Sequence, residues 1–521
     1  MARTLKPSSP DSPSVDLDRV RTVHLMAIAG TGMGSFAQLL KQAGYDVRGS
    51  DQKVWPPMSD LLCDAKIPFS EGFRAENLEP RPDLVIIGNV VRRANPEAAA
   101  VRALGLPHLS FPEALGSLFL ADRHPIVVAG THGKTTTTAM LSWLLHEAGR
   151  CPSFLVGGMV EGLRSSDPKT VRPPDIEEGS IAAGNEEQRI EERGRTGVSA
   201  VLGTGPHFVV EGDEYDTAYF DKGPKLLHYR PQTAILTSVE FDHADIFADE
   251  EHYESAFTRF LPLLPHDGYM AVCAGDARAV DLARSFAGCA IETYSAREDS
   301  PADWMAADMV FENGMTRFTI EHAGTVFVRA SMSISGRHNV ENALAATAVA
   351  ARLGLSPNEI AKGLVTFKGV ARRQQVVGEP DGITVIDDFA HHPTAVMETV
   401  RAVSEKYPGR RLWAVFEPRS NTARRNLHQS RYACSFDGAN HVVVAAPPPH
   451  PDAIPDKERL DPSRLVREIA ARGPVALHLP NPDEILGHLV GAVQSKDVVL
   501  LMSNGSFGGL SKRLVDALER R

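Results

Sequence analysis

A glycine-containing turn between an apolar segment and a helical pattern constrains the fold of this sequence most strongly. The apolar segment covers 125–129 and the helical pattern covers 136–147. The residues that join them are Gly130, Thr131, His132, Gly133, Lys134, Thr135 and Thr136. In such a turn the backbone N–H groups and the helix N-terminus attract phosphate, the lysine contacts it, and a hydroxyl reaches Mg²⁺. The usual pattern has a further glycine where this chain has Val128, so we predict a compact phosphate-binding loop. An ordinary strand-to-helix turn is the alternative.

Acidic and histidine residues follow two further apolar segments. Glu211 comes directly after 208–210, and Asp242-His243 follow 234–239. Carboxylates at the C-terminal ends of strands suit Mg²⁺, which neutralises the charge that develops in phosphoryl transfer. Each group alone is commonly a solvated turn or a structural histidine. Their occurrence behind a phosphate loop predicts a cation site.

A second glycine turn lies near the N-terminus. It follows the apolar segment 23–28, and Asp51 ends the next predicted strand. The turn consists of Gly30, Thr31, Gly32, Met33 and Gly34. This arrangement resembles a dinucleotide-binding fingerprint in which an acidic residue contacts a ribose or base, although Ser35 stands at the last glycine position. The turn alone favours nicotinamide, flavin and a nucleotide-linked sugar equally.

Apolar segments alternate with helical patterns in three successive regions, which predicts an α/β fold with parallel sheets covered on both faces. We place domain boundaries near Asp122 and Arg372. The predicted order is a mobile tail over 1–20, a Rossmann-like domain over 21–122, a central P-loop ATPase-like domain over 123–371 and a Rossmann-like C-terminal domain over 372–521. Residues 163–202 are rich in Glu, Gly, Arg, Ser and Pro without apolar periodicity, so we predict a solvated insertion loop there.

Composition and charge argue against several classes of protein. The formal net charge of -11 gives no broad basic surface, which argues against a general nucleic-acid binder. No apolar run approaches the roughly 20 residues that a membrane helix needs. The five cysteines form no CxxC pair, so neither a zinc site nor a disulfide framework is indicated. We therefore expect a cytoplasmic protein, a monomer or weak homodimer, that acts on small molecules.

The order of the motifs resembles the Mur ligase family over about residues 21–515. The matching motifs are Gly30-Thr31-Gly32-Met33-Gly34, Gly49-Ser50-Asp51, Gly130 to Thr137, Glu211-Gly212-Asp213-Glu214, Asp242-His243, Gly336 to Asn342, Arg372-Arg373 and Asp387 to Pro393. The resemblance implies one domain for a UDP-linked substrate, one for ATP, and a Rossmann-like domain that closes with the incoming amine.

Within that family, the short N-terminal domain and His391-His392-Pro393 resemble the branch that uses UDP-N-acetylmuramate. One kind of enzyme in this branch adds L-alanine, and another adds the recycled tripeptide L-alanyl-γ-D-glutamyl-meso-diaminopimelate. The stretches that resemble the tripeptide-adding enzymes are 88–90, 214–222, 241–247, 416–422 and 503–509. The resemblance therefore implies tripeptide ligation in peptidoglycan recycling, with L-alanine addition as the alternative. The insertion and Thr258, near the place where other branches carry a carbamylated lysine, depart from the family pattern.

The implied reaction is ATP-driven amide formation. A carboxylate is a poor electrophile, so ATP phosphorylates it and the amine then attacks the acyl phosphate, while the protein positions the reactants and neutralises charge. A dehydrogenase would leave the phosphate loop unexplained. A regulator that only binds a nucleotide sugar would not need Lys134, Glu211 and His243.

Roles for ATP and Mg²⁺ also follow from the resemblance. Thr135 and Glu211 should hold one Mg²⁺ ion, and Glu211 with His243 should hold a second. Lys134 should contact the β- and γ-phosphates of ATP, and Arg373 should reach the γ-phosphate. The other expected nucleotide-binding residues are Gly130, Thr131, His132, Gly133 and Thr136, Asn339 and Asn342 near adenine, and Asp388 near the ribose.

Substrate roles are divided between the first and last domains. His132 should face the muramoyl carboxylate, and His391 is a candidate base for the amine, with helix capping as the alternative. Arg419 suits bidentate pairing with a peptide carboxylate, with a solvated loop as the alternative. The expected substrate-binding residues are Gly30, Thr31, Gly32, Met33, Gly34, Asp51 and Asn89 for the nucleotide sugar, and Arg419, Asn421, Ser503 and Asn504 for the peptide.

Overall fold

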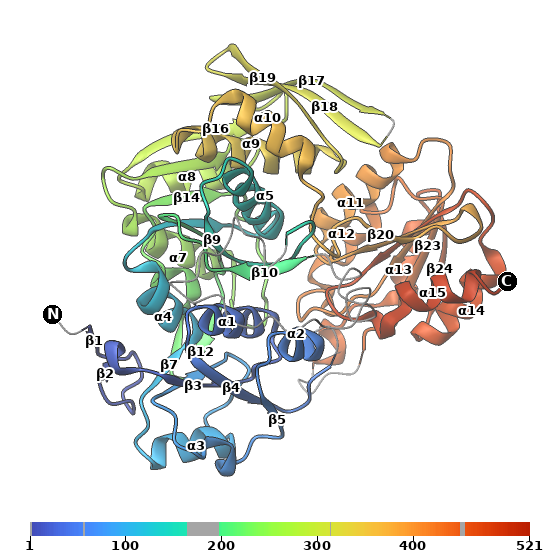
Figure 1. The fold of residues 1–521 in the computed structure, drawn as a ribbon. Helices are drawn as coiled ribbons and strands as arrows, with labels where there is room; N and C mark the ends of the chain where they lie inside the picture. Colours follow the sequence, from blue (N-terminus) through green and yellow to red (C-terminus); the bar gives the residue numbers. More distant parts are fainter. Residues whose placement is uncertain (1–2, 56–57, 164–196, 313, 449–453) are drawn as a thin grey trace, which may run out of the picture.

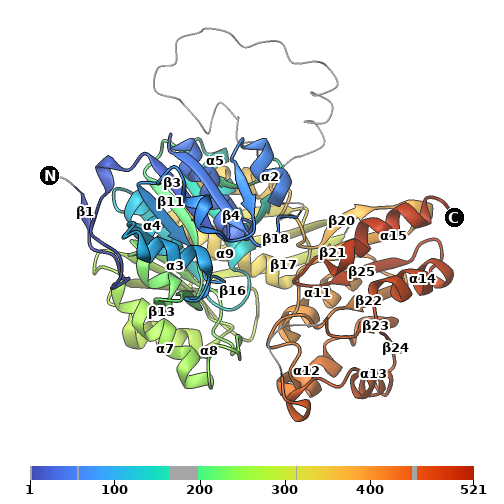
Figure 2. The same cartoon turned by 90° about the horizontal axis from the view of Figure 1, so that it is seen from below.

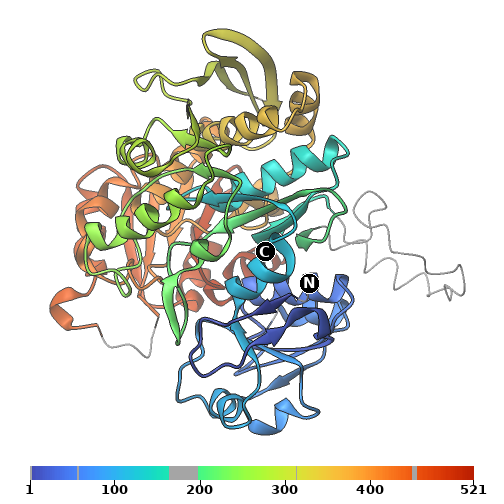
Figure 3. The ribbon, with the colours of Figure 1, turned by 90° about the vertical axis from the view of Figure 1, so that its left-hand side faces the viewer.

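The computed structural model describes residues 3–55, 58–163, 197–312, 314–448 and 454–521. Three α/β units, each built on its own main sheet, follow one another along the chain, which confirms the predicted fold class (Figure 1). The first unit, in blue, lies below the central unit in Figures 1 and 3. Figure 2 shows the C-terminal unit, in orange and red, beside the other two. None of the helices in the described part of the chain combines the length and apolar character needed to cross a membrane.

The first unit is a five-stranded parallel sheet in the order β5-β4-β3-β6-β7. Its strands are β3 (Thr22–Met26), β4 (Asp46–Asp51), β5 (Phe69–Glu71), β6 (Leu84–Ile87) and β7 (His108–Ser110). Its helices are α1 (Thr31–Gln42), α2 (Met58–Asp64), α3 (Pro96–Ala103) and α4 (Phe111–Leu115). Helix α1 begins within the first glycine turn, so this turn lies beyond the C-terminal end of β3, where open α/β sheets bind ligands.

Residues 3–20 do not form the mobile tail that their composition predicts. They contain β1 (Thr4–Leu5), β2 (Val15–Asp16) and a 3₁₀ helix over Leu17–Arg19. The Ser9 hydroxyl lies 2.8 Å from Nε2 of His108 in a buried contact, and Val15, Leu17 and Val20 are buried. The expectation was wrong because a few spaced apolar residues suffice to dock a polar segment, and average composition hides them.

The central unit is built on a ten-stranded sheet in the order β10-β9-β11-β8-β14-β15-β16-β17-β18-β19. The strands from β9 to β17 in this order run parallel, and antiparallel pairing adds β10 at one edge and the hairpin of β18 and β19 at the other. The bounds are β8 (His124–Ala129), β9 (Ser153–Val160), β10 (Val198–Val201), β11 (His207–Gly212), β14 (Thr233–Leu236), β15 (Tyr269–Cys273), β16 (Ala290–Ser295), β17 (Trp304–Glu312), β18 (Met315–His322) and β19 (Thr325–Met332). A separate hairpin consists of β12 (Asp216–Ala218) and β13 (Asp221–Pro224).

Two apolar clusters cover the faces of this central sheet. One includes residues of α5 (Lys134–Glu147), α9 (Arg337–Arg352) and α10 (Pro357–Thr366). The other includes residues of α7 (Glu250–Phe260) and α8 (Ala277–Phe286) and continues into α1 and α4 of the first unit. The first and central units therefore share one apolar core.

The predicted insertion loop over 163–202 was wrong at its C-terminal end. Val198–Val201 form strand β10, which pairs antiparallel with β9 at the edge of the central sheet. Leu163 is buried as well. Residues 164–196 lie outside the described residues. The run Val198 to Val201 is short and follows a charged stretch, so its apolar character is lost in a composition average.

The C-terminal unit is a six-stranded sheet in the order β20-β21-β25-β22-β23-β24, parallel except for β20. The strands are β20 (Gln375–Gly378), β21 (Thr384–Asp388), β22 (Leu412–Phe416), β23 (His441–Ala445), β24 (Val475–Leu479) and β25 (Val498–Met502). Residues of α11 (Pro393–Lys406), α12 (Gln429–Cys434) and α13 (Pro462–Ala470) share one apolar cluster, and those of α14 (Pro482–Ala492) and α15 (Leu510–Leu518) share another. The sheet is therefore covered on both faces, as predicted.

Candidate active site

Three neighbouring parallel strands of the central sheet end at the same level. Ala129 of β8 lies in register with Gly212 of β11 and with Leu236 of β14. The phosphate loop follows β8, Glu211 lies near the end of β11, and residues 239–243 follow β14. Motifs that are far apart in the sequence therefore meet at the C-terminal edge of one sheet, where open α/β sheets bind ligands.

The phosphate loop depends on glycine at two positions. Gly130 has φ 125° and Gly133 has φ 79°, a backbone region that other residues adopt at a cost. A Cβ atom on Gly133 would lie 2.5 Å from Oδ1 of Asn342, and one on Gly130 would lie 2.3 Å from Oγ1 of Thr237. No side chain caps the N-terminus of α5, so its first N–H groups can bind an anion.

Lys134 is held beneath this loop by a buried carboxylate. Its ammonium donates to Gly130 O at 2.5 Å and to Oε2 of Glu214 at 2.9 Å, and the Glu214 side chain is only 1% exposed. Burial opposes both charges, but the mutual attraction outweighs it, so the pKa of Lys134 is raised and that of Glu214 is lowered. The lysine is therefore charged and positioned at the loop before phosphate arrives.

Thr135 and Glu211 form the oxygen-rich part of the site. The Thr135 hydroxyl donates to Oε2 of Glu211 at 3.0 Å, and Nη2 of Arg373 lies 3.2 Å from the same hydroxyl. Burial, followed by repulsion from Asp213, raises the pKa of Glu211. Mg²⁺ prefers oxygen donors such as this hydroxyl and this carboxylate, whose negative charge the surroundings disfavour. These residues therefore fit the predicted cation.

His243 lies apart from the carboxylate with which we expected it to share an ion. Its Nε2 is 3.4 Å from Oε1 of Glu214, which also accepts from the Tyr253 hydroxyl at 3.3 Å. Burial disfavours the charged imidazole, but Glu214 and Asp242 outweigh this and raise the pKa of His243 to about 9. The imidazole is thus protonated here and has to release its proton before it can bind a metal ion.

The residues expected beside the nucleotide base support the loop through a chain of hydrogen bonds. The Thr137 hydroxyl donates to Oδ1 of Asn342 at 3.0 Å, and Nδ2 of Asn342 donates to Oδ1 of Asn339 at 3.1 Å. Asp388 accepts from the backbone N–H groups of Gln374 and Ala390, both at 2.7 Å. Asn339, Asn342 and Asp388 line the same cleft as the phosphate loop, and this cleft has a volume of about 1620 Å³.

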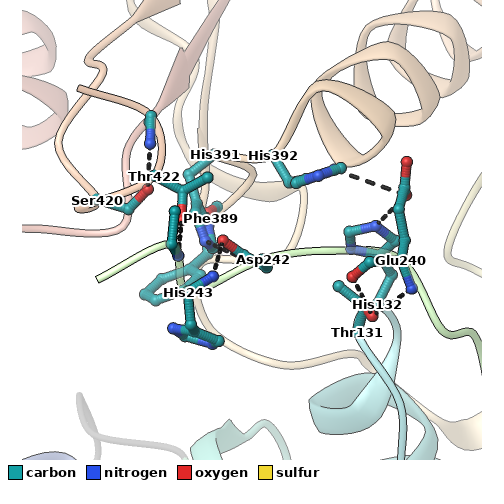
Figure 4. Close-up of polar contacts among 12 residues, drawn as sticks. Thr131, His132, Glu240, Asp242, His243, Phe389, His391, His392, Ser420 and Thr422 are labelled. Carbon is teal, nitrogen blue, oxygen red and sulfur yellow. Dashed lines mark hydrogen bonds and ion pairs between the residues drawn. The ribbon is translucent and has the colours of Figure 1, made fainter. Parts of the chain in front are cut away.

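A second cluster joins the phosphate loop to the C-terminal unit (Figure 4). Nε2 of His132 lies 2.7 Å from Oε2 of Glu240. The Thr394 hydroxyl donates to both Glu240 oxygens, at 3.0 and 2.8 Å, and Arg431 donates to Oε1. Burial opposes the charge of Glu240, but His132 and its other partners lower its pKa far below the usual value. Nδ1 of His392 approaches the same carboxylate to 3.7 Å.

A smaller pocket of about 360 Å³ adjoins this cluster. Three of the four residues expected to bind the peptide line it, namely Arg419, Asn421 and Asn504, together with His391 and Asp242. Ser503 does not; its hydroxyl donates to Oε2 of Glu417 instead. Asn421 donates to Asp245 at 2.7 Å, and the Arg419 side chain is 42% exposed with its guanidinium 3.6 Å from Glu417. The pocket thus offers an arginine and amides to an anionic ligand.

Only some residues of the first glycine turn line the large cleft. Thr31 and Gly32 line the cleft, whereas Met33 and Gly34 are buried in α1. Oδ2 of Asp51 accepts from the backbone N–H of Ala29 at 2.9 Å, and Asn89 is exposed after β6. The structure therefore connects this turn to the phosphate loop through one continuous cleft.

Sequence reasoning missed three residues of the site. Glu214 belongs to the same acidic motif as Glu211, but a motif does not tell which carboxylate faces the lysine. Glu240 lies two residues before Asp242 but outside that motif, and only the folded arrangement brings it to His132. Arg431, on α12, belongs to no motif, and only the folded arrangement brings it to Glu240.

Family models match nearly the whole chain. The model of the Mur ligase family catalytic domain matches residues 22–123, that of the Mur ligase middle domain matches 128–350, and that of the Mur ligase glutamate ligase domain matches 372–505.

Individual proteins are similar over nearly full length. The UDP-N-acetylmuramate–L-alanyl-γ-D-glutamyl-meso-2,6-diaminoheptandioate ligase of Haemophilus influenzae is 35% identical, covering 96% of this chain and 100% of the relative. The UDP-N-acetylmuramate–L-alanine ligase of Alkaliphilus metalliredigens is 30% identical, covering 94% and 96%. A crystal structure of a murein peptide ligase from Psychrobacter arcticus is 34% identical with a TM-score of 0.69, covering 96% of this chain and 99% of that one.

Proposed function

The chain belongs to the Mur ligase family, and on this premise we propose that it joins the tripeptide L-alanyl-γ-D-glutamyl-meso-diaminopimelate to UDP-N-acetylmuramate with ATP. Its similarity to a tripeptide-adding relative, at 35% over 96% of the chain, supports this reaction. The observation that carries the choice of substrate is the 360 Å³ pocket with Arg419, because a tripeptide brings carboxylates that L-alanine lacks. In this cell-wall recycling reaction, the nucleotide sugar supplies the carboxylate and the peptide supplies the amine.

The first step is phosphorylation of the muramoyl carboxylate by ATP. We assign the β- and γ-phosphates to the N-terminus of α5, Lys134 and Arg373, which already converge there. Positive groups fixed around the transferred phosphoryl group stabilise its charge without having to reorganise. His132, in the loop and beside Glu240, faces the carboxylate that receives the phosphoryl group.

Thr135 and Glu211 are the residues that would hold Mg²⁺, with His243 available to a second ion after it loses its proton. A bound Mg²⁺ ion supplies positive charge next to the phosphates. Glu211 suits this task because burial raises the pKa of its carboxyl group, so a cation relieves an unfavourable charge. Asn339, Asn342 and Asp388 are assigned to the nucleoside side of the same cleft.

In the second step the peptide amine attacks the acyl phosphate, the new C–N bond forms, and phosphate leaves with the C–O electron pair. We assign the role of base to His391. Its Nδ1 lies 3.1 Å from Phe389 O, so in the neutral ring this nitrogen carries the proton and Nε2 is free to accept one. Nε2 lies 3.8 Å from Oδ2 of Asp242, whose charge stabilises the imidazolium that results.

The test compares amine substrates in a steady-state assay with UDP-N-acetylmuramate and ATP. We expect kcat/KM for the tripeptide to exceed that for L-alanine at least tenfold, since one charge-assisted hydrogen bond contributes about 1.5–3 kcal/mol. Arg419→Ala should raise the KM for the tripeptide and leave the KM for ATP unchanged, whereas the control Arg464→Ala, at an exposed pair on α13, should change neither.

Two outcomes would redirect the assignment. Equal use of L-alanine would favour the alanine-adding activity and leave the ligase assignment standing. Absence of any ATP hydrolysis that depends on UDP-N-acetylmuramate would remove the ligase assignment. We also propose domain boundaries after residues 122 and 371; the start of β8 at His124 and of β20 at Gln375 supports this division.

A further inference from the structure

Two imidazoles and one carboxylate from three separate segments meet where the phosphate loop faces the C-terminal unit. His132 belongs to the loop, Glu240 follows β14, and His392 precedes α11. One donor atom from each lies within 4.8 Å of the other two. Nε2 of His132 is 2.7 Å and Nδ1 of His392 is 3.7 Å from the same oxygen, Oε2 of Glu240. Figure 4 shows both rings directed at this carboxylate.

We propose that His132, Glu240 and His392 form a binding site for a transition-metal ion of the Zn²⁺ type. Two imidazole nitrogens and one carboxylate oxygen are a donor set that Zn²⁺ binds, whereas Mg²⁺ prefers oxygen donors and water. The site is therefore distinct in chemistry from the one assigned to Thr135 and Glu211. The sequence shows no short metal-binding motif here, because the three donors are far apart along the chain.

The two distances from the imidazole nitrogens to Oε2 of Glu240 are close to those that a tetrahedral ion requires. Zn–N and Zn–O bonds of about 2.0–2.1 Å place donor atoms about 3.4 Å apart. From the present 2.7 and 3.7 Å, His132 has to move outward by about 0.7 Å and His392 inward by about 0.3 Å, changes that side-chain rotation supplies. His132 and Glu240 line the open cleft, whereas His392 is buried behind them, so a fourth position on the cleft side is accessible to water or a ligand.

The surroundings hold the three donors in place. Arg431 donates to Oε1 of Glu240 and the Thr394 hydroxyl is shared between both oxygens, which fixes the carboxylate with Oε2 toward the imidazoles. The backbone N–H of His132 donates to the Ser238 hydroxyl at 3.1 Å. Nδ1 of His392 accepts from the N–H of Thr394 at 3.4 Å, so in the neutral ring this nitrogen carries the lone pair, and it has to give up this long hydrogen bond to bind an ion. The contacts to Glu240 and to the backbone of His132 are outer contacts of the kind that orient metal ligands and tune affinity.

A bound ion would tie the phosphate loop to the C-terminal unit. His132 and Glu240 lie in the central unit and His392 lies at the start of α11. The ion would also bind the imidazole of His132, which we expect to face the muramoyl carboxylate. Micromolar Zn²⁺ is therefore expected to slow the ligase in the presence of excess Mg²⁺; this consequence alone rests on the proposed function, and the binding test below does not.

The experiment is a calorimetric titration of the metal-free, full-length protein with Zn²⁺ in excess Mg²⁺, with Co²⁺ absorption as a second readout of tetrahedral coordination. We expect one site in the wild-type protein. His392→Asn should weaken binding at least tenfold and abolish the tetrahedral Co²⁺ spectrum, because asparagine can still cap α11 but provides no imidazole. Glu240→Gln should have the same effect.

His428→Asn is the matched control. Its ring lies 4.9 Å from that of His392 and is also buried, but it contributes no donor to the cluster, so Zn²⁺ affinity should be unchanged. Circular dichroism of each variant without metal confirms that it is folded. The proposal is overturned if wild-type protein binds no Zn²⁺ below millimolar concentrations. It is equally overturned if folded His392→Asn and Glu240→Gln bind as tightly as wild type, or if only Glu211→Gln weakens binding.

Discussion

At the scale of single residues, charges below the phosphate loop depend on one another. Glu214 contacts the Lys134 ammonium at 2.9 Å and lies 3.4 Å from His243, in a position that is almost fully buried. Glu211, only three positions earlier, lies in a field that disfavours its charge, because burial and Asp213 raise its pKa. Two carboxylates of one motif therefore contribute to stability with opposite sign.

Substitution of each carboxylate by glutamine should separate structure from function. Glu214→Gln leaves a buried lysine without its counter-ion, which costs up to about 3–5 kcal/mol of unfolding free energy. Glu211→Gln removes an unfavourable charge, so stability should be equal or higher, while ligase activity falls by orders of magnitude and requires more Mg²⁺. Urea unfolding and a Mg²⁺ titration of activity measure both effects. Equal destabilisation of the two variants would contradict the assigned roles.

His243 should make stability depend on pH in the alkaline range. Its pKa is raised from 6.5 to about 9 in the folded chain, chiefly by Glu214 against the opposing effect of burial. The folded state therefore binds this proton more tightly, so the contribution is complete below about pH 6.5 and is lost as the pH rises toward 9. His243→Asn should lower the unfolding free energy at pH 6 more than at pH 9. A difference that does not change between these pH values would show that His243 is not held protonated.

At the scale of elements, the backbone conformation of the loop between β8 and α5 depends on contacts with a neighbouring helix. Gly133 has a positive φ, and its missing Cβ leaves room for the Asn342 side chain from α9. Asn342 in turn receives the Thr137 hydroxyl, so α9 supports the first turn of α5. The loop is thus held by a neighbouring helix as well as by its own sequence.

Gly133→Ala should damage nucleotide binding, and Gly149→Ala is its matched control. Both glycines have positive φ, 79° and 70°, so alanine costs about 1 kcal/mol or more at either. Only at Gly133 does the added Cβ meet an atom, Oδ1 of Asn342 at 2.5 Å, whereas nothing lies within 4 Å at Gly149. We expect weaker ATP binding in calorimetry for Gly133→Ala alone. Similar ATP affinity of the two variants would show that the contact with Asn342 does not shape the loop.

The elements around the loop could be predicted because their sequence signals are local. The apolar segments before the loop and before Asp242 became β8 and β14, and the glycines marked the turn. Strand β10 and the docked residues 3–20 were missed, since an edge strand and a packed tail are stabilised by contacts with distant residues. The same reason hid Glu240 and Arg431, whose meeting depends on the placement of two units.

At the scale of the whole molecule, the three units are joined in different ways. The first and central units share one apolar cluster, which contains Phe36 of the first unit and Phe257 of the central unit. The two apolar clusters of the C-terminal unit contain residues of that unit alone. It contacts the segment after β14 through polar side-chain bonds, among them Asn421 to Asp245 and the Arg431 and Thr394 bonds to Glu240. The C-terminal unit is therefore the one most readily displaced.

Arg431→Ala should loosen this polar contact without unfolding the protein. The pair with Glu240 is half exposed, and such pairs contribute up to about 1 kcal/mol, which corresponds to a shift of about fivefold between joined and separated arrangements. Hydrogen exchange of the backbone amides in residues 239–245 and 391–394 should therefore accelerate by up to about fivefold. Arg472→Ala is the control, because Arg472 is similarly exposed and pairs with Asp437 within the C-terminal unit. Unchanged exchange in Arg431→Ala, or equal acceleration in the control, would show that other contacts hold the two units together.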